Sequence, residues 1–209
     1  MIEREDAARA FCAERTTDAG GIARLESLAA MLAEENQRQN LVSSNSLATI
    51  WQRHFADSLQ LLDVVPRGTA PWIDLGSGAG VPGLVLACAR PDDGIVLVES
   101  RKRRVEWLTR AAEALGLENC RILGSRLENV ETFPAAVITA RAFAPLGKLL
   151  QLSARFSTRD TVWLLPKGRS AAQELSEQPP GVRDMFHVEQ SATDPEGGIL
   201  IGRGTPQLR

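Results

Sequence analysis

The stretch from residue 74 to residue 83 has the composition and spacing of a cofactor-binding loop. It reads Asp-Leu-Gly-Ser-Gly-Ala-Gly-Val-Pro-Gly, follows the apolar residues Trp72 and Ile73, and precedes a largely apolar run at residues 84–89. Glycines at alternate positions allow a sharp turn and let the backbone approach a ligand without a Cβ in the way. The carboxylate of Asp74, two residues before the first glycine, suits a cofactor with a positive end better than a pyrophosphate. These residues favour S-adenosylmethionine as the cofactor, and therefore a methyltransferase.

The glycine segment also predicts which residues contact that cofactor. Gly76, Gly78 and Gly80 form the glycine ladder, and Asp74 is expected to meet the amino-acid end of the cofactor, directly or through water. Residues 78–83 match G-x-G-x-x-G as well, a pattern that is weak by itself and fits a dinucleotide site. A nicotinamide-dependent dehydrogenase is therefore the rival class of enzyme.

An acidic residue closes the next predicted strand. Glu99 follows the run Ile-Val-Leu-Val and lies 16 positions after Gly83, which leaves room for one helix, a turn and a strand. Its two carboxylate oxygens can accept both hydroxyls of an adenosine ribose. Ser100 is expected to cap the helix that follows. Glu99 supports an adenosine cofactor without choosing between the two classes of enzyme.

Three later segments also follow predicted strands. Leu127 and Glu128 lie in a loop that is suited to holding the adenine, although a solvated loop is an equal alternative. Arg141 follows the fourth strand, where many methyltransferases face the transferring methyl group, and a structural salt bridge is the alternative. Lys167 follows the fifth strand and could take a phosphate or a base.

The elements that must position these residues alternate between strands and helices. The strands are predicted at residues 72–75, 95–99, 120–123, 136–139, 161–165, 182–189 and 199–203, with helices near 82–90, 101–115, 146–156 and 170–176. This alternation predicts an α/β, Rossmann-like fold with a mostly parallel seven-stranded sheet, whose ligands bind at the carboxyl ends of the strands. Residues 1–70 have apolar side chains at helical spacing and predict an N-terminal helical extension, and residues 71–209 form the Rossmann-like methyltransferase domain.

Charge and composition narrow the possible partners. The 209 residues carry a net charge of −2, but residues 71–171 carry +4 and both flanking segments carry −3. A local basic face can steer a polyanion, and Arg103 and Arg104 are candidates to contact phosphates, with a solvated helix face as the even alternative. Three cysteines without C-x-x-C spacing argue against a disulfide framework or a metal site. The sequence contains no run of about 18 apolar residues, so we predict no membrane-spanning helix. We expect a cytoplasmic protein.

In combination, the motifs resemble the bacterial glucose-inhibited division protein B family from about residue 28 to the C-terminus. The segments that carry the resemblance are 40–43 (Asn-Leu-Val-Ser), 53–58 (Arg-His-Phe-Ala-Asp-Ser), 74–83, 99–104, 125–128, 141–142 and 167–168. The resemblance implies methylation of guanine N7 in the decoding-region loop of 16S rRNA with S-adenosylmethionine. We expect a monomer that acts on this RNA as the 30S subunit or an assembly precursor. It implies cofactor contacts at Gly76, Val81, Leu127, Glu128 and Arg141, and an RNA face that includes Arg53, His54 and Lys167.

Guanine N7 bears an in-plane lone pair, so its methylation requires no general base. The rate is then expected to come from alignment of N7 with the methyl carbon. Among residues that could assist, Arg141, Asp57 and His54 are the candidates, with Asp57 placed to stabilise the cationic product base. Phe143 either stacks on the base or belongs to the core. The alternatives are a methyltransferase for another RNA or a small molecule, and a non-catalytic ribosome-binding module.

Overall fold

The computed structural model describes residues 1–208 and contains one seven-stranded sheet with the strand order β3-β2-β1-β4-β5-β7-β6. The strands are β1 (Trp72–Leu75), β2 (Ile95–Glu99), β3 (Cys120–Gly124), β4 (Val137–Thr139), β5 (Val162–Gly168), β6 (Phe186–Gln190) and β7 (Gly198–Arg203). Strands β1 to β5 are parallel, and β7 runs antiparallel to both β5 and β6. The predicted α/β fold with a mostly parallel seven-stranded sheet is confirmed.

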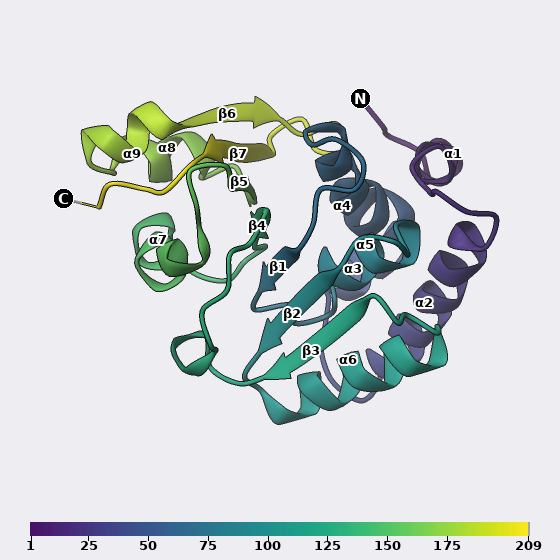
Figure 1. Ribbon diagram of the computed structural model, residues 1–209. Helices are drawn as coiled ribbons and strands as arrows, with labels where there is room; N and C mark the ends of the chain where they lie inside the picture. Colours follow the sequence, from purple (N-terminus) through teal and green to yellow (C-terminus); the bar gives the residue numbers. More distant parts are fainter. Residues whose placement is uncertain (209) are drawn as a thin grey trace.

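Helices cover both faces of this sheet (Figure 1). The N-terminal part holds α1 (Glu5–Ala13), α2 (Gly21–Glu35), α3 (Ser44–Leu47), the π-helical η1 (Trp51–Ala56), α4 (Asp57–Leu59) and the 3₁₀ turn η2 (Gln60–Asp63). The rest holds α5 (Gly83–Ala89), α6 (Lys102–Ala114), η3 (Leu127–Asn129), α7 (Leu146–Ser153), η4 (Ala154–Phe156), α8 (Ala171–Ser176) and α9 (Pro180–Met185). One hydrophobic cluster joins α2, α5 and α6 to one face, and a second joins α7, α8 and α9 to the other.

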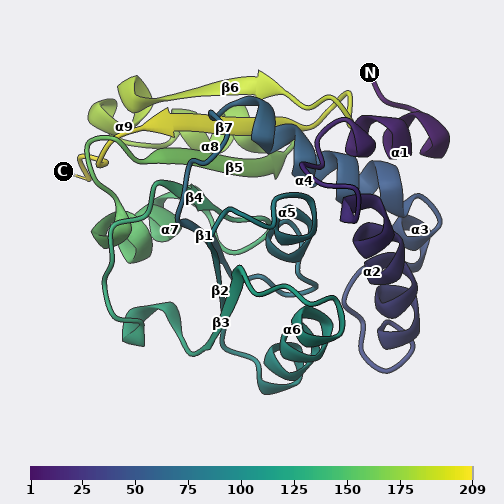
Figure 2. The same ribbon diagram turned by 45° about the vertical axis from the view of Figure 1, so that its right-hand side comes forward.

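The N-terminal helices form an outer layer on the α5 and α6 side, as Figure 2 shows. Leu25, Leu28 and Leu32 recur along one face of α2 and are fully or almost fully buried, in the same cluster as Leu84 of α5. Burial of an apolar side chain of this size stabilises the fold by about 1.5–3 kcal/mol. The helical segment is therefore fixed against the glycine-loop side of the sheet, where it can contribute to a site.

Two predicted boundaries are wrong in the antiparallel part of the sheet, which β5, β7 and β6 form. Strand β5 continues to Gly168, because Pro166 and Gly168 pair with β7, where the sequence predicted a loop. Residues 182–185 belong to α9 instead of a strand, and β6 begins only at Phe186.

The sequence predicted that the three cysteines are small buried side chains without disulfides. Cys12 and Cys88 are buried as expected and Cys120 is partly buried, and all three are free thiols. Within residues 1–208, no helix has the length and apolarity that a bilayer crossing requires.

Candidate active site

The predicted site residues gather at the carboxyl edge of the parallel strands. Two cavities lie there, one of about 200 Å³ beside the glycine loop and one of about 650 Å³ between β5, β7 and the N-terminal helices. Ala142 and Phe143, in the loop after β4, line both cavities. This loop is therefore the wall through which the two cavities adjoin.

The glycine loop after β1 requires backbone conformations that side chains disfavour. Gly76, Gly78 and Gly80 have φ values of +68°, +55° and +88°. The Phe143 ring lies so close to Gly76 that a Cβ there would be 2.4 Å from Cδ2 of the ring. Glycine is required at residue 76 both by the turn and by the aromatic ring packed on it.

Glu99 is the main acceptor of backbone amides at this edge. Its Oε2 accepts from the Gly78 N–H at 3.0 Å, and its Oε1 accepts from the Ser100 and Arg101 N–H groups at 2.7 and 2.9 Å. Arg104 lies 3.9 Å from Oε2. The predicted capping role of Ser100 is wrong, because α6 begins at Lys102 and Glu99 itself satisfies the amides that precede it.

Several cofactor candidates surround the smaller cavity. The residues that line it include Gly76, Glu99, Leu127, Arg104 and Phe143. The other candidates are not in its lining: Asp74, Gly78, Gly80, Val81, Glu128 and Arg141, the last of which lines the larger cavity. Val81 is buried in the core and Glu128 is exposed.

Asp74 lies fully buried beneath the glycine loop. One carboxylate oxygen, Oδ2, accepts from the Gly83 N–H at 3.1 Å, and the other, Oδ1, has no hydrogen-bond partner among the described residues. Burial raises the pKa of Asp74 to about 6. A buried acceptor without a partner, a glycine turn and the Glu99 carboxylate together fit a cofactor that brings donors and positive charge, as S-adenosylmethionine does.

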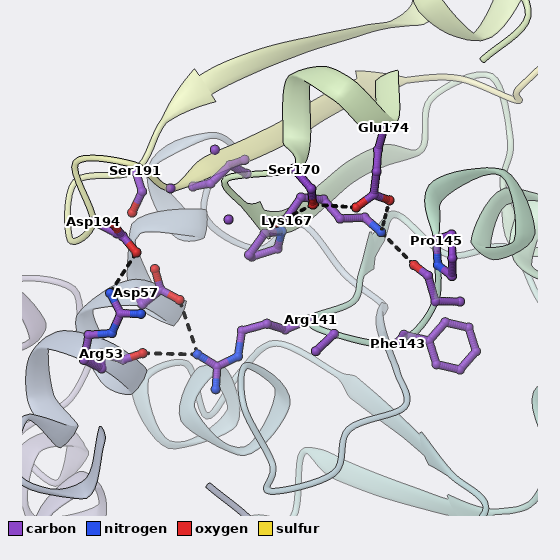
Figure 3. A pocket seen from close by; sticks show the side chains of 17 residues that line it. Arg53, Asp57, Arg141, Phe143, Pro145, Lys167, Ser170, Glu174, Ser191 and Asp194 are labelled. Carbon is purple, nitrogen blue, oxygen red and sulfur yellow. Dashed lines mark hydrogen bonds and ion pairs between the residues drawn. The ribbon is translucent and has the colours of Figure 1, made fainter. Parts of the chain in front are cut away.

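The larger cavity is lined by three cationic side chains from different parts of the chain, as Figure 3 shows, and each is paired with a carboxylate that also lines the cavity. Arg141 extends from the loop after β4 towards the N-terminal helices, where Nη1 donates to the Arg53 carbonyl at 3.1 Å and lies 3.4 Å from Asp57 Oδ2. Arg53 is half exposed and pairs with Asp194 at 2.8 Å. Burial lowers the pKa of Arg141, although Asp57 opposes the shift.

His54 is buried instead of lying on an exposed RNA-binding face. Its Nδ1 lies 2.8 Å from Nη2 of Arg141, and its Nε2 lies 3.0 Å from Oγ of Ser46. Burial and the charges of Arg141 and Arg53 lower the pKa of His54 to about 3. The ring is therefore neutral at pH 7.

Lys167 lies on the opposite wall, in β5. Its Nζ donates to the Ala144 carbonyl at 2.7 Å and pairs with Glu174 at 3.0 Å, and its side chain is 8% exposed. Although burial raises the pKa of Glu174, hydrogen bonds from Ser170 and Lys167 hold it below its ordinary value. Glu174 was not predicted as a site residue, and no sequence signal beyond its place one helical turn after Ser170 pointed to it.

The structure thus brings together only part of the predicted RNA set. Of the predicted RNA contacts, Arg53 and Lys167 line the larger cavity, beside the catalytic candidates Asp57 and Arg141. His54 contacts Arg141 without lining this cavity, and Arg104 lines the smaller one. Arg103 lies outside the larger cavity, exposed on the first turn of α6, with Nη2 donating to the Arg38 carbonyl at 2.9 Å.

The fold and the glycine-loop site define the class of S-adenosylmethionine-dependent methyltransferases. A solved structure described as a SAM dependent methyltransferase from Aquifex aeolicus has the same fold, with a TM-score of 0.57, 12% identity, and coverage of 81% of this chain and 97% of that one.

Within this class the chain belongs to the family described as rRNA small subunit methyltransferase G, whose model matches residues 21–192. It is 61% identical to the ribosomal RNA small subunit methyltransferase G of Erythrobacter litoralis over 98% of both chains. It is 53% identical to the protein of that name from Novosphingobium aromaticivorans, over 89% of this chain and 82% of the relative. The family that the sequence motifs resemble is confirmed.

Proposed function

We propose that this protein transfers a methyl group from S-adenosylmethionine to N7 of a guanine in the decoding-region loop of 16S rRNA. The observation that carries this proposal is the junction of the two cavities at Phe143. The smaller cavity has the glycine turn and the acid of a cofactor site. The larger one is lined by Arg53, Arg141 and Lys167, each paired with a carboxylate of the lining, and an anionic acceptor would compete with those carboxylates for the cations. Family membership supports ribosomal RNA as that acceptor.

The cofactor is proposed to lie along the glycine loop, held by the residues predicted for it. Glu99 is placed to accept hydrogen bonds from the ribose, and Asp74 to attract the positive amino-acid end. Leu127 forms an apolar wall of the smaller cavity. The remaining contacts are assigned to Gly76, Gly78, Gly80, Val81, Glu128 and Arg141.

S-adenosylmethionine supplies an electrophilic methyl group on a sulfonium centre. Guanine N7 carries a lone pair, so no side chain has to remove a proton before attack. The neutral His54 ring agrees with this, because its acceptor nitrogen is already bonded to Arg141. The protein contributes by alignment, which can supply several kcal/mol of barrier reduction.

Arg141 and Asp57 are proposed to act on the acceptor base. Arg141 lines the larger cavity with a side chain that is three-quarters buried, and its guanidinium is suited to a carbonyl or phosphate oxygen of the RNA. Asp57 lies beside it and can offset the positive charge that N7 methylation places on the base. Its Oδ1 accepts hydrogen bonds from Thr193 and Gln60. Its Oδ2 contacts Arg141, so Oδ2 is the oxygen proposed to act on the base.

Outside the cavity, exposed cations are proposed to hold the RNA backbone. Arg103 is exposed on the first turn of α6, Arg104 beside it is partly exposed and lines the smaller cavity, and Arg53 borders the larger cavity. Recognition of a base in a loop suits RNA, because the major groove of an A-form helix is too narrow to read. We propose that one copy of the chain acts on the 30S subunit or an assembly precursor in the cytoplasm.

Transfer of tritium from labelled S-adenosylmethionine tests this proposal. The substrates are 30S subunits and naked 16S rRNA purified from a strain that lacks the gene. Label in either substrate supports the proposal, and the preferred one identifies the stage of assembly. Binding of S-adenosylhomocysteine without label in either substrate would contradict 16S rRNA as the acceptor and leave another RNA or a small molecule.

A further inference from the structure

The two hydrogen bonds of His54 select one form of its ring. A guanidinium only donates, so Nδ1, at 2.8 Å from Nη2 of Arg141, must be the acceptor and carries no proton. The single proton of the neutral ring then resides on Nε2, which donates to Oγ of Ser46 at 3.0 Å. Ser46 can accept because its own hydroxyl hydrogen is directed to the Ser43 carbonyl at 2.8 Å.

The guanidinium of Arg141 is held on two nitrogens by different groups. Nη1 faces the Arg53 carbonyl and the Asp57 carboxylate. Within residues 1–208, the only hydrogen-bond partner of Nη2 is Nδ1 of His54. His54 therefore holds the second terminal nitrogen of the guanidinium, which the contacts of Nη1 do not reach, and adds a third point that fixes its orientation.

The backbone that presents these partners is unusual. Arg53 and His54 belong to the π-helical η1, a wider turn that occurs mainly in short pieces and often at functional sites. This turn directs the Arg53 carbonyl and the His54 ring to the same guanidinium, although the two residues are consecutive.

The charged groups around His54 favour its neutral form. Arg141 approaches from the loop after β4, and Arg53 lies on η1 itself; both disfavour a proton on the ring. Asp57, in α4, is paired with Arg141, and Ser46 offers only a hydroxyl. A protonated ring would lose its acceptor for Arg141 and place two positive charges in contact.

We propose that His54 is a positioning residue, which as a neutral Nε2–H tautomer holds the Arg141 guanidinium in the orientation that the acceptor base meets. His54 is not expected to touch the RNA or move a proton in the reaction. The effect on methyl transfer rests on the proposed function, whereas the tautomer and the hydrogen bond do not.

Two substitutions distinguish the roles of the two ring nitrogens of His54. In His54→Asn the side-chain oxygen lies near the place of Nδ1 and can accept from Arg141. In His54→Gln the amide lies near the place of Nε2 and reaches Ser46 instead. A hydrogen bond to a charged group contributes about 1.5–3 kcal/mol. We therefore expect His54→Gln to lower the single-turnover rate constant roughly 10- to 100-fold. The affinity for S-adenosylhomocysteine and the KM for RNA should not change. His54→Asn should recover most of the lost rate.

The exposed His187 of β6 provides the control, because His187→Gln should leave kcat at the wild-type value. Equal losses in His54→Asn and His54→Gln, or wild-type rates in both, would overturn the proposal. Thermal unfolding of each variant identifies losses that come from misfolding. If a His54 variant misfolds, the nitrogen-15 shifts of the wild-type ring test the proposal instead.

Nitrogen-15 shifts of the ring test the tautomer without any activity. The chain has two histidines, so His187→Gln assigns the His54 signals directly. We expect a protonated Nε2 and a bare Nδ1 from pH 7.5 to pH 5, and a change of the Nδ1 shift in Arg141→Leu. A ring that titrates near its ordinary pKa, or a proton on Nδ1, would overturn the proposal. If the wild type fails to methylate 16S rRNA but shows these shifts, only the proposed function fails.

Discussion

At the scale of single residues, two acids shape the cofactor site in different ways. Glu99 has three backbone amides directed at its carboxylate, so the orientation of both oxygens is fixed before any ligand arrives. Asp74 is fully buried and keeps one oxygen without a partner. A buried carboxylate with one unpaired oxygen lowers the stability of the free protein, as groups that serve a ligand often do.

Asp74→Asn should therefore stabilise the free protein and weaken the cofactor complex. The folded-state pKa of Asp74 is raised above its unfolded value, so ionisation at pH 7 costs folding free energy that a neutral amide avoids. We expect a melting temperature higher by a few degrees and S-adenosylmethionine affinity lower by about tenfold, since loss of a charge-assisted contact costs about 1.5–3 kcal/mol. Differential scanning calorimetry and titration calorimetry measure the two effects, and a fall in both stability and affinity would contradict this account.

His54 makes the opposite contribution to the pH dependence of stability. Its folded pKa of about 3 lies below its ordinary value of 6.5, so below pH 6.5 the unfolded chain binds a proton that the folded protein does not. Stability is therefore lost as the pH falls. Protonation of Asp74 raises the stability of the folded protein over part of the same pH range. This contribution is the same in the wild type and in the His54 variant, so it cancels when their stabilities are compared.

In urea unfolding, the wild type should lose about 2 kcal/mol more than His54→Asn between pH 7 and pH 5. His187→Asn should follow the wild type, because that ring is exposed. Parallel pH curves for the wild type and His54→Asn would show that His54 titrates normally.

At the scale of elements, the sequence predicted the strands and the loop after β1, because a short apolar strand, a glycine ladder and a helix start are local signals. It did not predict the π-helical turn at Trp51–Ala56, since the two residues that it aligns contact a loop almost 90 positions away. It also ended β5 too early, at Leu165, because the pairing that extends the strand comes from β7, an antiparallel partner later in the chain.

Gly76→Ala tests whether the loop after β1 and the loop after β4 act as one unit. A Cβ at residue 76 would meet the Phe143 ring and displace it towards one of the two cavities. Gly116 has a similar φ of +63° with open space around its Cβ position, so Gly116→Ala incurs only the backbone cost, about 1–2 kcal/mol.

We expect Gly76→Ala to lose more stability than Gly116→Ala, because it also displaces the Phe143 ring, and Gly76→Ala alone to lose S-adenosylhomocysteine affinity by about tenfold or more. Titration calorimetry on the two variants measures this directly. Equal affinities would mean that Phe143 is free to move without affecting the cofactor site.

At the scale of the whole molecule, the parallel sheet explains why residues distant in sequence form one site. The carboxyl ends of β1, β2, β4 and β5 bring Asp74, Glu99, Arg141 and Lys167 to one edge, as the alternating pattern predicted. The sequence could not show that the helical extension completes the larger cavity, because only packing of the N-terminal helices places Arg53 and Asp57 there and sets His54 against Arg141.

The basic run at the start of α6 predicts a salt-dependent contact with RNA. Arg103→Gln should weaken binding of 16S rRNA and lower the slope of log K against log salt by about one, as loss of one phosphate contact does. Arg159→Gln, an equal change of charge in the turn before β5 at the opposite edge of the sheet, should leave the slope unchanged. Filter binding over a series of salt concentrations distinguishes them, and identical slopes would remove Arg103 from the RNA face.

The position and chemistry of the transferred methyl group test the central claim most directly. N7-methylguanosine in RNA is converted by borohydride and aniline into a strand break that primer extension locates. After reaction with this protein, 16S rRNA from a strain that lacks the gene should show one new break, at a guanine of the decoding-region loop. A methylated product without a break in that loop would contradict guanine N7 as the acceptor, whatever the fold and the cofactor.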